Sequence, residues 1–366
     1  MKQTEYHGFD SIRNLAGILE QEKTKNVFLV TGGRSYETCG AQDAIEEQLS
    51  GGSFTRFCDF TPNPKIEEIK KGLKEFGEKD YDMIVGVGGG SSIDVAKAIK
   101  MFHCEKGGKN IPLVAIPTTA GSGSKATYFI VYYVGKQKQS AGRVDLTLPN
   151  YAICNPKLTM SLPKGIAAST GIDALGQAME SYWSINSTLE SQGKAENAIR
   201  ILMGNLEENV NFPTRESRRR VMRAANLSGK AINLTKTAAC HSVAYPITSY
   251  FGIPHGHAVG LTLGEMLVFN SQVKDRDCND ERGVEYVRRT MDKLVRMLGA
   301  LNPEEARDKI KCLMENIGLA TKLSELGIDK EGVGVIVKNG FTPERVKNNP
   351  KVLTEDGLRG VLERIL

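Results

Sequence analysis

The sequence comprises 366 residues, of which 25% are charged and 40% hydrophobic, with a formal net charge of +5 at pH 7. This composition is typical of globular proteins and excludes a disordered or fibrous chain, while the length predicts two domains rather than one core. Apolar runs are too short for a membrane span, and the first residues lack the apolar core of a signal peptide, so no membrane partner is expected. Seven scattered cysteines without a C-x-x-C pair predict reduced thiols and a cytoplasmic protein.

Strand and helix patterns alternate up to about residue 160. Runs of β-branched and apolar residues predict strands over 26–31, 54–60, 81–87, 112–116, 127–134 and 151–154. Apolar residues at helical spacing predict helices over 66–78 and 92–104. Such alternation is typical of a parallel sheet covered by helices on both faces, so residues 1–160 are interpreted as an α/β dinucleotide-binding domain.

From Pro163 onward helical periodicity replaces this alternation. It is clearest over 190–211, 214–234 and 284–299, and strand-like runs are scarce. Residues 161–366 are therefore expected to form an all-helical domain. The basic stretch at 215–220 is interpreted as a solvated helix face, and no nucleic-acid partner is expected because no exposed aromatic residues accompany it.

Three consecutive glycines, Gly88, Gly89 and Gly90, separate the strand predicted over 81–87 from the helix predicted over 92–104. Glycine lets the backbone approach a diphosphate closely, and the start of the helix directs unpaired N–H groups toward phosphate oxygens. The spacing is neither the G-x-G-x-x-G fingerprint nor a P-loop. A tight turn alone would need fewer glycines, so the pattern favours phosphate binding.

A second polar turn follows the strand predicted over 112–116. It combines hydroxyl side chains with glycines: Thr118, Thr119, Gly121, Ser122 and Gly123. Alone, this segment would pass as a polar loop. Two such turns at the carboxyl ends of successive strands favour a dinucleotide site at an edge of the sheet.

The turn after the first predicted strand bears on the choice between NADH and NADPH. Dinucleotide folds that bind NAD place an acidic residue here, where it binds the ribose 2′-hydroxyl and repels a 2′-phosphate. This chain has Gly32 and Gly33 followed by Arg34, whose planar guanidinium can bind a phosphate. NADPH is therefore expected to be favoured over NADH. The alternative is that Arg34 only faces water.

Histidines are few, but three of them, His241, His255 and His257, lie close together in the sequence. Upstream, Asp173 and Gln177 are four residues apart and share one face of a predicted helix. A carboxylate with two imidazoles suits Zn²⁺ or Fe²⁺. The spacing matches no zinc-finger or H-E-x-x-H pattern, so spacing alone does not define a metal site.

Four motifs together resemble the iron-containing, or group III, alcohol dehydrogenase family: GGGSSIDVAK, PTTAGSGS, GIDAL and the histidine pair that ends in PHG. The likeness continues in order to the closing NNPKVLTEDGLRGVL and covers essentially the whole chain. It implies a dehydroquinate synthase-like fold, with an α/β dinucleotide domain, an all-helical metal domain and an active site in the cleft between them. It also implies an NAD(P)H-dependent alcohol dehydrogenase or aldehyde reductase, for which we expect a homodimer.

The resemblance assigns roles by position. Asp173, His241 and His255 are the implied metal ligands. The residues implied to line the cofactor are Gly88, Gly89, Gly90, Ser91, Asp94, Thr118, Thr119 and Ser122, with Lys138, in the turn at 136–139, implied to contact the nicotinamide ribose.

This chain departs from the family pattern at three positions that bear on the chemistry. Gln177 stands where most members have a histidine, so its amide oxygen or a water would complete the ligand set of Fe²⁺ or Zn²⁺. Tyr245 stands where many members have a proton-relaying histidine, and His257 is the other candidate for that role. Lys125 replaces a glutamate that usually follows the GSGS turn.

The sequence around Asp173, Tyr245 and His255 resembles the phosphonate-metabolism branch of the family, similar to phosphonoacetaldehyde reductases, which make 2-hydroxyethylphosphonate. A phosphonate needs a cation near the metal, and Lys125 is expected to supply it. One alternative is a dehydrogenase of primary alcohols such as butanol, with Lys125 facing solvent. Others are a glycerol-phosphate-type dehydrogenase and a dehydroquinate-synthase-like lyase that consumes no net NAD(P)H. A non-catalytic protein that only senses a dinucleotide is disfavoured, because it would have no need for the metal ligands Asp173, His241 and His255.

Overall fold

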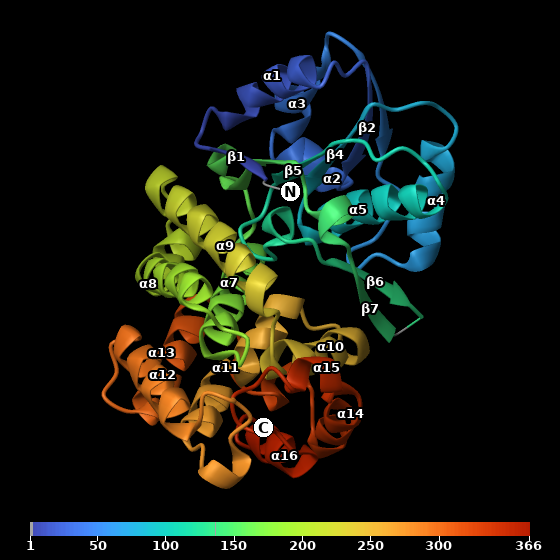
Figure 1. Cartoon of the computed structure of the whole chain (residues 1–366). Coiled ribbons are helices and arrows are strands. Elements are labelled where there is room, and N and C mark those ends of the chain that lie inside the picture. The colour runs from blue at the N-terminus through green and yellow to red at the C-terminus, as the bar shows by residue number, and fades with distance from the viewer. Residues whose placement is uncertain (1–2, 136) are drawn as a thin grey trace. The chain divides into compact units, whose positions relative to one another are not determined.

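The computed structural model describes residues 3–135 and 137–366. The chain folds into two compact units that are joined in sequence between Leu162 and Pro163. The first unit contains a parallel sheet with helices and the second is built of helices (Figure 1), which confirms the predicted fold class. No helix among the described residues is long and apolar enough to cross a membrane.

A six-stranded parallel sheet forms the centre of the first unit, with the order β1-β8-β5-β4-β2-β3. Its strands are β1 (Thr4–His7), β2 (Asn26–Thr31), β3 (Ser53–Phe57), β4 (Met83–Gly88), β5 (Leu113–Pro117) and β8 (Tyr151–Cys154). Because β2, β4 and β5 are neighbours and run in the same direction, the three glycine-containing turns that follow them lie along one edge of the sheet.

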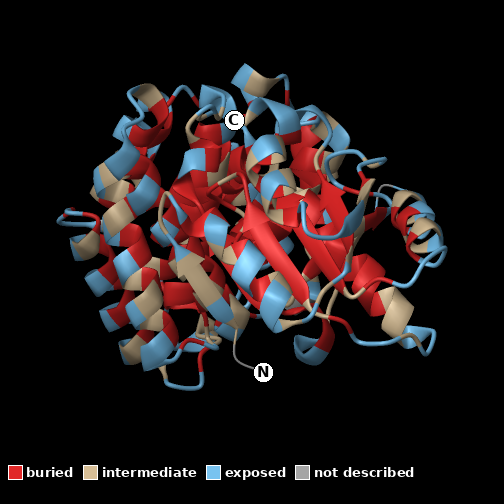
Figure 2. Ribbon diagram, turned by 90° about the horizontal axis from the view of Figure 1, so that it is seen from above, coloured by how far each residue is buried: buried red, intermediate tan, exposed pale blue. Residues whose placement is uncertain are grey.

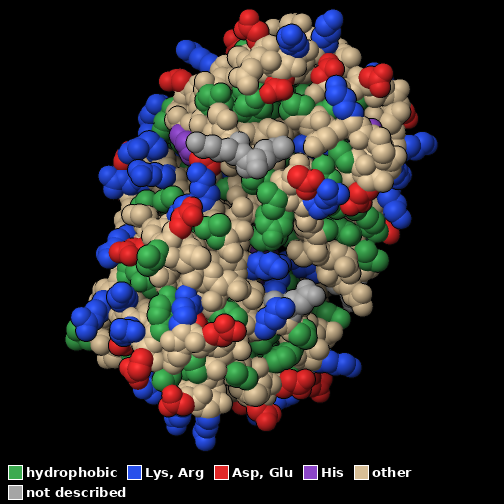
Figure 3. Space-filling model, in the orientation of Figure 1, with side chains coloured by type: hydrophobic (Ala, Val, Ile, Leu, Met, Phe, Trp, Pro, Cys, Tyr) green, Lys and Arg blue, Asp and Glu red, His purple; other side chains and the backbone are tan. Residues whose placement is uncertain are grey.

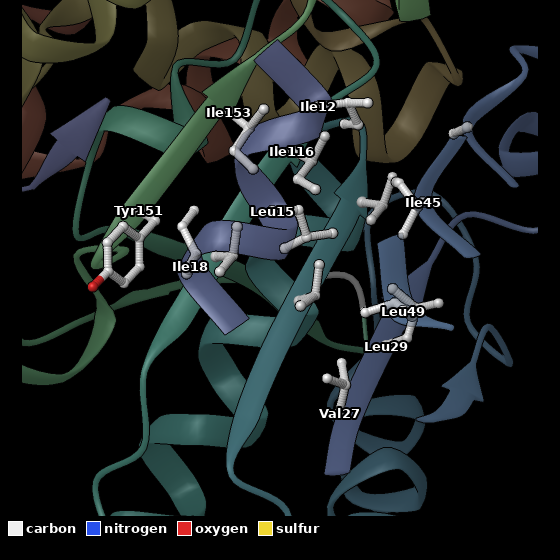
Figure 4. Packing of buried hydrophobic residues seen from close by; sticks show 14 of the residues in the cluster. Ile12, Leu15, Ile18, Val27, Leu29, Ile45, Leu49, Ile116, Tyr151 and Ile153 are labelled. Carbon is white, nitrogen blue, oxygen red and sulfur yellow. The ribbon is translucent and has the colours of Figure 1, made fainter. Parts of the chain in front are cut away.

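Helices cover both faces of this sheet. They are α1 (Asn14–Gln21), α2 (Arg34–Thr38), α3 (Ala41–Leu49), α4 (Ile66–Phe76), α5 (Gly90–Glu105) and α6 (Val144–Thr147). Successive strand residues point to opposite sides. Val27 and Leu29 therefore pack with α1 and α3 in the cluster of Figure 4, whereas Phe28 and Val30 pack with α4 and α5 on the other face.

Two strands, β1 and β7, were not predicted from the sequence, because backbone pairing rather than the burial of apolar side chains stabilises them. β1 is a short edge strand that pairs with β8, and only half of its residues are partly buried. β7 (Gln137–Ala141) is polar and pairs in antiparallel fashion with β6 (Ile130–Val134). Lys138 therefore lies in a strand opposite Tyr133 and not in a turn, which corrects the expectation; Lys136 lies outside the described residues.

The second unit contains α7 (Lys164–Trp183), α8 (Leu189–Asn211), α9 (Arg215–Thr235), α10 (Ala239–Phe251), α11 (His255–Ser271), α12 (Val284–Met297), α13 (Pro303–Asn316), α14 (Lys330–Gly340), α15 (Pro343–Val346) and α16 (Glu355–Glu363). Helix α7 is buried at every position from Gly171 to Trp183. Figure 2 shows the same contrast across the chain, with buried inner strands and helices and exposed outer helix faces. A polar side chain on α7 is thus in the interior and needs a partner there.

The basic stretch at the start of α9 is a solvated surface only in part, because Arg218 is buried and its Nη1 donates to Asn209 Oδ1 at 3.4 Å. Arg219 and Arg220 both form exposed ion pairs with Glu216. On the face of the molecule seen in Figure 3, Lys and Arg side chains are interspersed with acidic ones. Such exposed pairs contribute little to stability, about 1 kcal/mol or less each.

A buried cation fastens the second polar turn to α5. The Lys97 ammonium, which is fully buried, donates to the carbonyl oxygens of Ser124, Thr127 and Phe129 at 2.6, 2.8 and 3.0 Å. The buried Asp94 carboxylate accepts from the Ser124 hydroxyl and from the backbone N–H of Val131. Burial lowers the pKa of Lys97 to about 8, against the attraction of Asp94. Residues Ser124–Ala126 form a short 3₁₀ helix, and β6 begins at Ile130, later than the strand start predicted at 127.

We predict that Lys97→Met lowers the free energy of unfolding by about 3–5 kcal/mol, because it leaves Asp94 and the carbonyls of Ser124, Thr127 and Phe129 without their cation. Lys100→Met is the matched control. Lys100 is equally buried, but the one hydrogen bond that it makes within the described residues is to Asn150, at 3.4 Å, so its replacement should change stability by about 1 kcal/mol or less. Urea denaturation measures both. Equal losses in the two variants would contradict a special role for Lys97.

Candidate metal centre and cofactor turns

Three potential metal ligands converge in the second unit from three different helices. Asp173 comes from α7, His241 from α10 and His255 from the first position of α11. One ligand atom of each residue lies within 4.8 Å of the others. Asp173 and His241 are buried, with Oδ1 and Nε2 3.3 Å apart, while His255 is partly exposed.

The polar atoms at this point fit a divalent cation. Asp173 Oδ1, Gln177 Oε1 and His241 Nε2 are buried, and no described residue gives them a hydrogen bond. Burial alone would raise the pKa of Asp173, but the adjacent His241 and His255 imidazoles outweigh it and hold that pKa below its usual range. Carboxylate, imidazole and amide atoms left unpaired together are costly in a protein interior unless a metal binds them. The donor set suits Fe²⁺ or Zn²⁺.

Gln177 lies one helical turn after Asp173 and faces it. Its Nε2 donates to Asp173 Oδ2 at 3.0 Å, which fixes the carboxylate and leaves Oδ1 available. The Gln177 Oε1 atom is buried without a hydrogen-bond partner among the described residues. The Gln177 side chain thus orients the Asp173 carboxylate, and its Oε1 atom is a neutral oxygen that could bind a metal ion.

Glycines allow α7 and α11 to approach each other closely at the ligand cluster. A Cβ added at Gly256, directly after His255, would lie 1.9 Å from the Ser169 carbonyl oxygen and 2.7 Å from Asp173 Cβ. A Cβ at Gly176 would lie 2.4 Å from Val259 Cγ1. Because both contacts are far shorter than van der Waals distance, any larger residue would push α11 away from α7 and separate His255 from Asp173.

A further buried carboxylate on α7, Glu180, was not predicted from the sequence. Glu180 Oε2 lies 2.6 Å from His241 Nδ1, and its oxygens accept from the backbone N–H groups of Ala238 and Cys240 at 2.9 and 2.5 Å. A carboxylate on Nδ1 keeps the proton there and leaves Nε2 bare for a metal. It also neutralises the unpaired N–H groups at the start of α10. The spacing of seven residues from Asp173 on one helix face was the signal that could have revealed it.

The two candidates for proton relay have different surroundings. The Tyr245 ring stacks on His255, with centroids 5.6 Å apart and an interplanar angle of 10°. The guanidinium of Arg345, from α15, lies 5.3 Å from the centre of the Tyr245 ring. His257 is buried, and its Nε2 donates to the Ala320 carbonyl at 2.7 Å. Tyr245 therefore lies against a potential metal ligand, whereas the donor of a neutral His257 is engaged by the backbone.

In the first unit, the turns after β4 and β5 pack against each other. Gly88 has φ +147°, and a Cβ there would lie 2.4 Å from Ser92 Oγ, so this position requires glycine. A Cβ at Gly90 would lie 2.7 Å from Ser122 Oγ. A small pocket is lined by both turns, including Gly88, Gly89, Gly90, Thr119, Ser122 and Lys125. The structure thus brings together the two segments from which a phosphate site was predicted.

Other residues that were expected at the cofactor differ in their surroundings: some are hydrogen-bonded within the first unit, one is buried and one is exposed. Asp94 is turned into the unit and braces the second turn, as described above. Ser91 Oγ accepts from the Asn63 N–H at 3.2 Å. Lys125 is 2% exposed and lines the pocket, which is inconsistent with a side chain that faces solvent. Arg34 is exposed at the first position of α2.

Two family profiles account for nearly all of this architecture. The profile described as iron-containing alcohol dehydrogenase matches residues 3–156, and that described as the Fe-containing alcohol dehydrogenase family, C-terminal, matches residues 167–366. The chain belongs to the iron-containing alcohol dehydrogenase family. It is accordingly an oxidoreductase of alcohols or aldehydes that uses a nicotinamide cofactor.

Several relatives of this alcohol dehydrogenase are described by substrate. A phosphonoacetaldehyde reductase of Streptomyces viridochromogenes is 33% identical over 302 residues, which are 77% of this chain and 75% of the relative. An NADPH-dependent butanol dehydrogenase of Clostridium saccharobutylicum is 27% identical, over 98% and 95% of the two chains. The crystal structure of sulfoacetaldehyde reductase from Bifidobacterium kashiwanohense in complex with NAD⁺ superposes with a TM-score of 0.87 at 28% identity, covering 99% and 96%.

For this alcohol dehydrogenase we predict that Glu180→Gln lowers the affinity for Zn²⁺ about 10–100-fold, because the charged carboxylate that accepts from His241 Nδ1 is replaced by a neutral and weaker amide acceptor. Competition with a chromogenic chelator measures the affinity of apoprotein. Glu265→Gln is the control, since Glu265 is also a buried acid on a helix of this unit but pairs with Arg307 and Arg364. Unchanged affinity in a folded Glu180→Gln variant would show that Glu180 only caps α10.

Proposed function

We propose that this alcohol dehydrogenase reduces phosphonoacetaldehyde to 2-hydroxyethylphosphonate with NADPH. The observation that carries the proposal is that the Arg345 guanidinium lies against the Tyr245 ring, which itself stacks on the potential metal ligand His255. The 33% identical phosphonoacetaldehyde reductase and the sulfoacetaldehyde reductase both act on small aldehydes that carry an anion, which supports the same substrate class.

The proposed metal ligands are Asp173, His241 and His255, with Gln177 Oε1 as a fourth. When bound, Fe²⁺ or Zn²⁺ supplies a Lewis acid for the carbonyl group and the nicotinamide ring supplies hydride. Glu180 holds the imidazole of His241 in place. The ring of Tyr245 stacks on His255, and its hydroxyl is the proposed proton donor. His257 is the second candidate, because its Nε2 is hydrogen-bonded to the Ala320 carbonyl.

Arg345 is the residue best placed to bind the substrate anion. Its Nη1 donates to the Thr237 hydroxyl, and no described carboxylate lies within 4.0 Å of its guanidinium. The charge is therefore not neutralised by an ion pair with a described residue. In phosphonoacetaldehyde one methylene group separates the carbonyl carbon from phosphorus, so the site needs a cation within a few ångströms of the bound carbonyl group. Lys125, the cation expected from the sequence, is retained as a second candidate because it is buried beside the cofactor turns.

The proposed cofactor site follows the three turns at the edge of the sheet. Gly88, Gly89 and Gly90 would approach the diphosphate, with Ser91, Thr118, Thr119 and Ser122 as hydroxyl donors and Lys138 at the nicotinamide ribose. Gly32 and Gly33, with Arg34 beside them, favour NADPH. All seven cysteines are free, which supports work in the reducing cytoplasm.

A second candidate function is the oxidation or reduction of neutral primary alcohols and aldehydes such as butanol and butanal. The NADPH-dependent butanol dehydrogenase among the relatives favours it. In that case Arg345 would serve only to pack α15 against Tyr245.

We predict that wild-type protein reduces phosphonoacetaldehyde at least about tenfold more efficiently, in kcat/KM, than propanal, since a charge-assisted bond contributes about 1.5–3 kcal/mol. Arg345→Gln should remove most of this preference and leave propanal reduction within about twofold. Lys125→Met tests the other candidate, and Arg364→Gln is a control on a cation that pairs with Glu265.

Equal efficiency of wild type with both aldehydes would contradict the phosphonate substrate and favour the butanol-type function. A preference that survives in both Arg345→Gln and Lys125→Met would leave the substrate intact but show that neither cation anchors it.

A further inference from the structure

The side chain of Arg56 contacts the turn after β2, a contact that was not predicted from the sequence. Arg56 lies on β3, where it is paired with Leu29 of β2. Because the two strands are parallel neighbours, its long side chain reaches the turn at the carboxyl end of β2. This is the turn formed by Gly32 and Gly33, which bears on the choice between NADH and NADPH.

The guanidinium of Arg56 is held in one orientation over this turn. Its Nε donates to the Thr31 hydroxyl at 2.9 Å, and its Nη2 lies 3.4 Å from the carbonyl oxygens of both Gly32 and Gly33. The group also stacks on the buried Tyr36 ring, 4.7 Å from its centre. Little side-chain entropy remains to be lost when a ligand binds such a preorganised group.

One edge of this guanidinium is left for a ligand. Nη1 donates no hydrogen bond to any residue within 3–135 or 137–366, and its nearest acid is Glu37, at 3.5 Å. The Glu37 carboxylate is 56% exposed, whereas Arg56 is 23% exposed. An exposed pair at this distance is weak and can be displaced by a more highly charged anion.

We propose that Arg56 binds the 2′-phosphate of NADPH and that Glu37 competes with this phosphate for the same Nη1 edge. The proposal rests on the NADPH preference proposed above. Dinucleotide folds place the adenosine ribose at this turn, and hydrogen bonds from a guanidinium nitrogen to a phosphate are charge-assisted. The space beside Gly33 is open, since a Cβ there would meet nothing within 4 Å.

Arg34 is the obvious rival, because it is adjacent to the turn in sequence. It is exposed, and no hydrogen bond or ion pair links it to the described residues. A free arginine must lose rotamer entropy on binding, whereas Arg56 is already fixed. Arg34 is therefore assigned a smaller contribution than Arg56.

Binding of adenosine fragments to the purified full-length protein tests this assignment without turnover. Isothermal titration compares 2′,5′-ADP with 5′-AMP, which differ only in the 2′-phosphate. Wild type should bind 2′,5′-ADP at least about tenfold more tightly. Arg56→Gln should weaken 2′,5′-ADP about 10–100-fold and change 5′-AMP by less than about twofold. Glu37→Gln should tighten 2′,5′-ADP, and Arg34→Gln should weaken it less than Arg56→Gln does.

The possible results distinguish a failure of the role assigned to Arg56 from a failure of the NADPH preference itself. Equal affinity of wild type for the two fragments would overturn the NADPH preference itself. A wild-type preference that persists in Arg56→Gln would overturn only the role of Arg56, as would a larger loss in Arg34→Gln. Weaker binding of both fragments by Arg56→Gln would show that Arg56 merely supports the turn. Kinetic comparison of NADPH with NADH in the same variants should reproduce the fragment result.

Discussion

The helical unit depends on a buried line of polar groups in which Glu180, His241 and Asp173 follow one another. Glu180 engages Nδ1 of the imidazole at 2.6 Å, and Nε2 of the same ring lies 3.3 Å from Asp173. Both carboxylates belong to α7, so the histidine of α10 is fixed against a single helix. An interior carboxylate without partners would be destabilising. Here the N–H groups of α10 satisfy Glu180, and a divalent ion would satisfy what remains open around Asp173.

The close packing of α7 and α11 places the third potential ligand, His255, beside these buried polar groups. Helix α7 is buried along most of its length, and small residues recur along it, among them Ala168, Gly171, Ala174, Gly176 and Ala178. Gly176 and Gly256 have no room for a side chain, and through them α11 approaches closely enough to deliver His255. The first unit uses the same device, since Gly88 and Gly90 let the turns after β4 and β5 touch. In both units, glycine allows backbone segments to approach each other closely, and a buried charged side chain fixes the orientation of the groups around it.

The sequence predicted those features that a local pattern determines. The strands over 26–31 and 151–154 were predicted with the bounds observed, because each is a continuous apolar run in a buried parallel sheet. β7 was missed because its polar residues are held only by pairing with β6. The glycine turns and the convergence of Asp173, His241 and His255 were anticipated, the latter through family resemblance. Glu180, Arg56 and Arg345 were not, because their partners are 61, 25 and 108 residues away in the chain. Such contacts exist only once the fold has formed.

The metal content of the purified protein tests most directly whether Asp173, His241 and His255 enclose a catalytic ion. Elemental analysis of wild type reconstituted with Zn²⁺ or anaerobically with Fe²⁺ should give about one ion per chain, and His255→Ala with a native circular dichroism spectrum should retain roughly a tenth or less. Aldehyde reduction should fall in parallel and should also be lost when a chelator removes the ion from wild type. Equal metal content in wild type and His255→Ala, or full activity of metal-free wild type, would contradict the assignment of this cluster as the catalytic metal site.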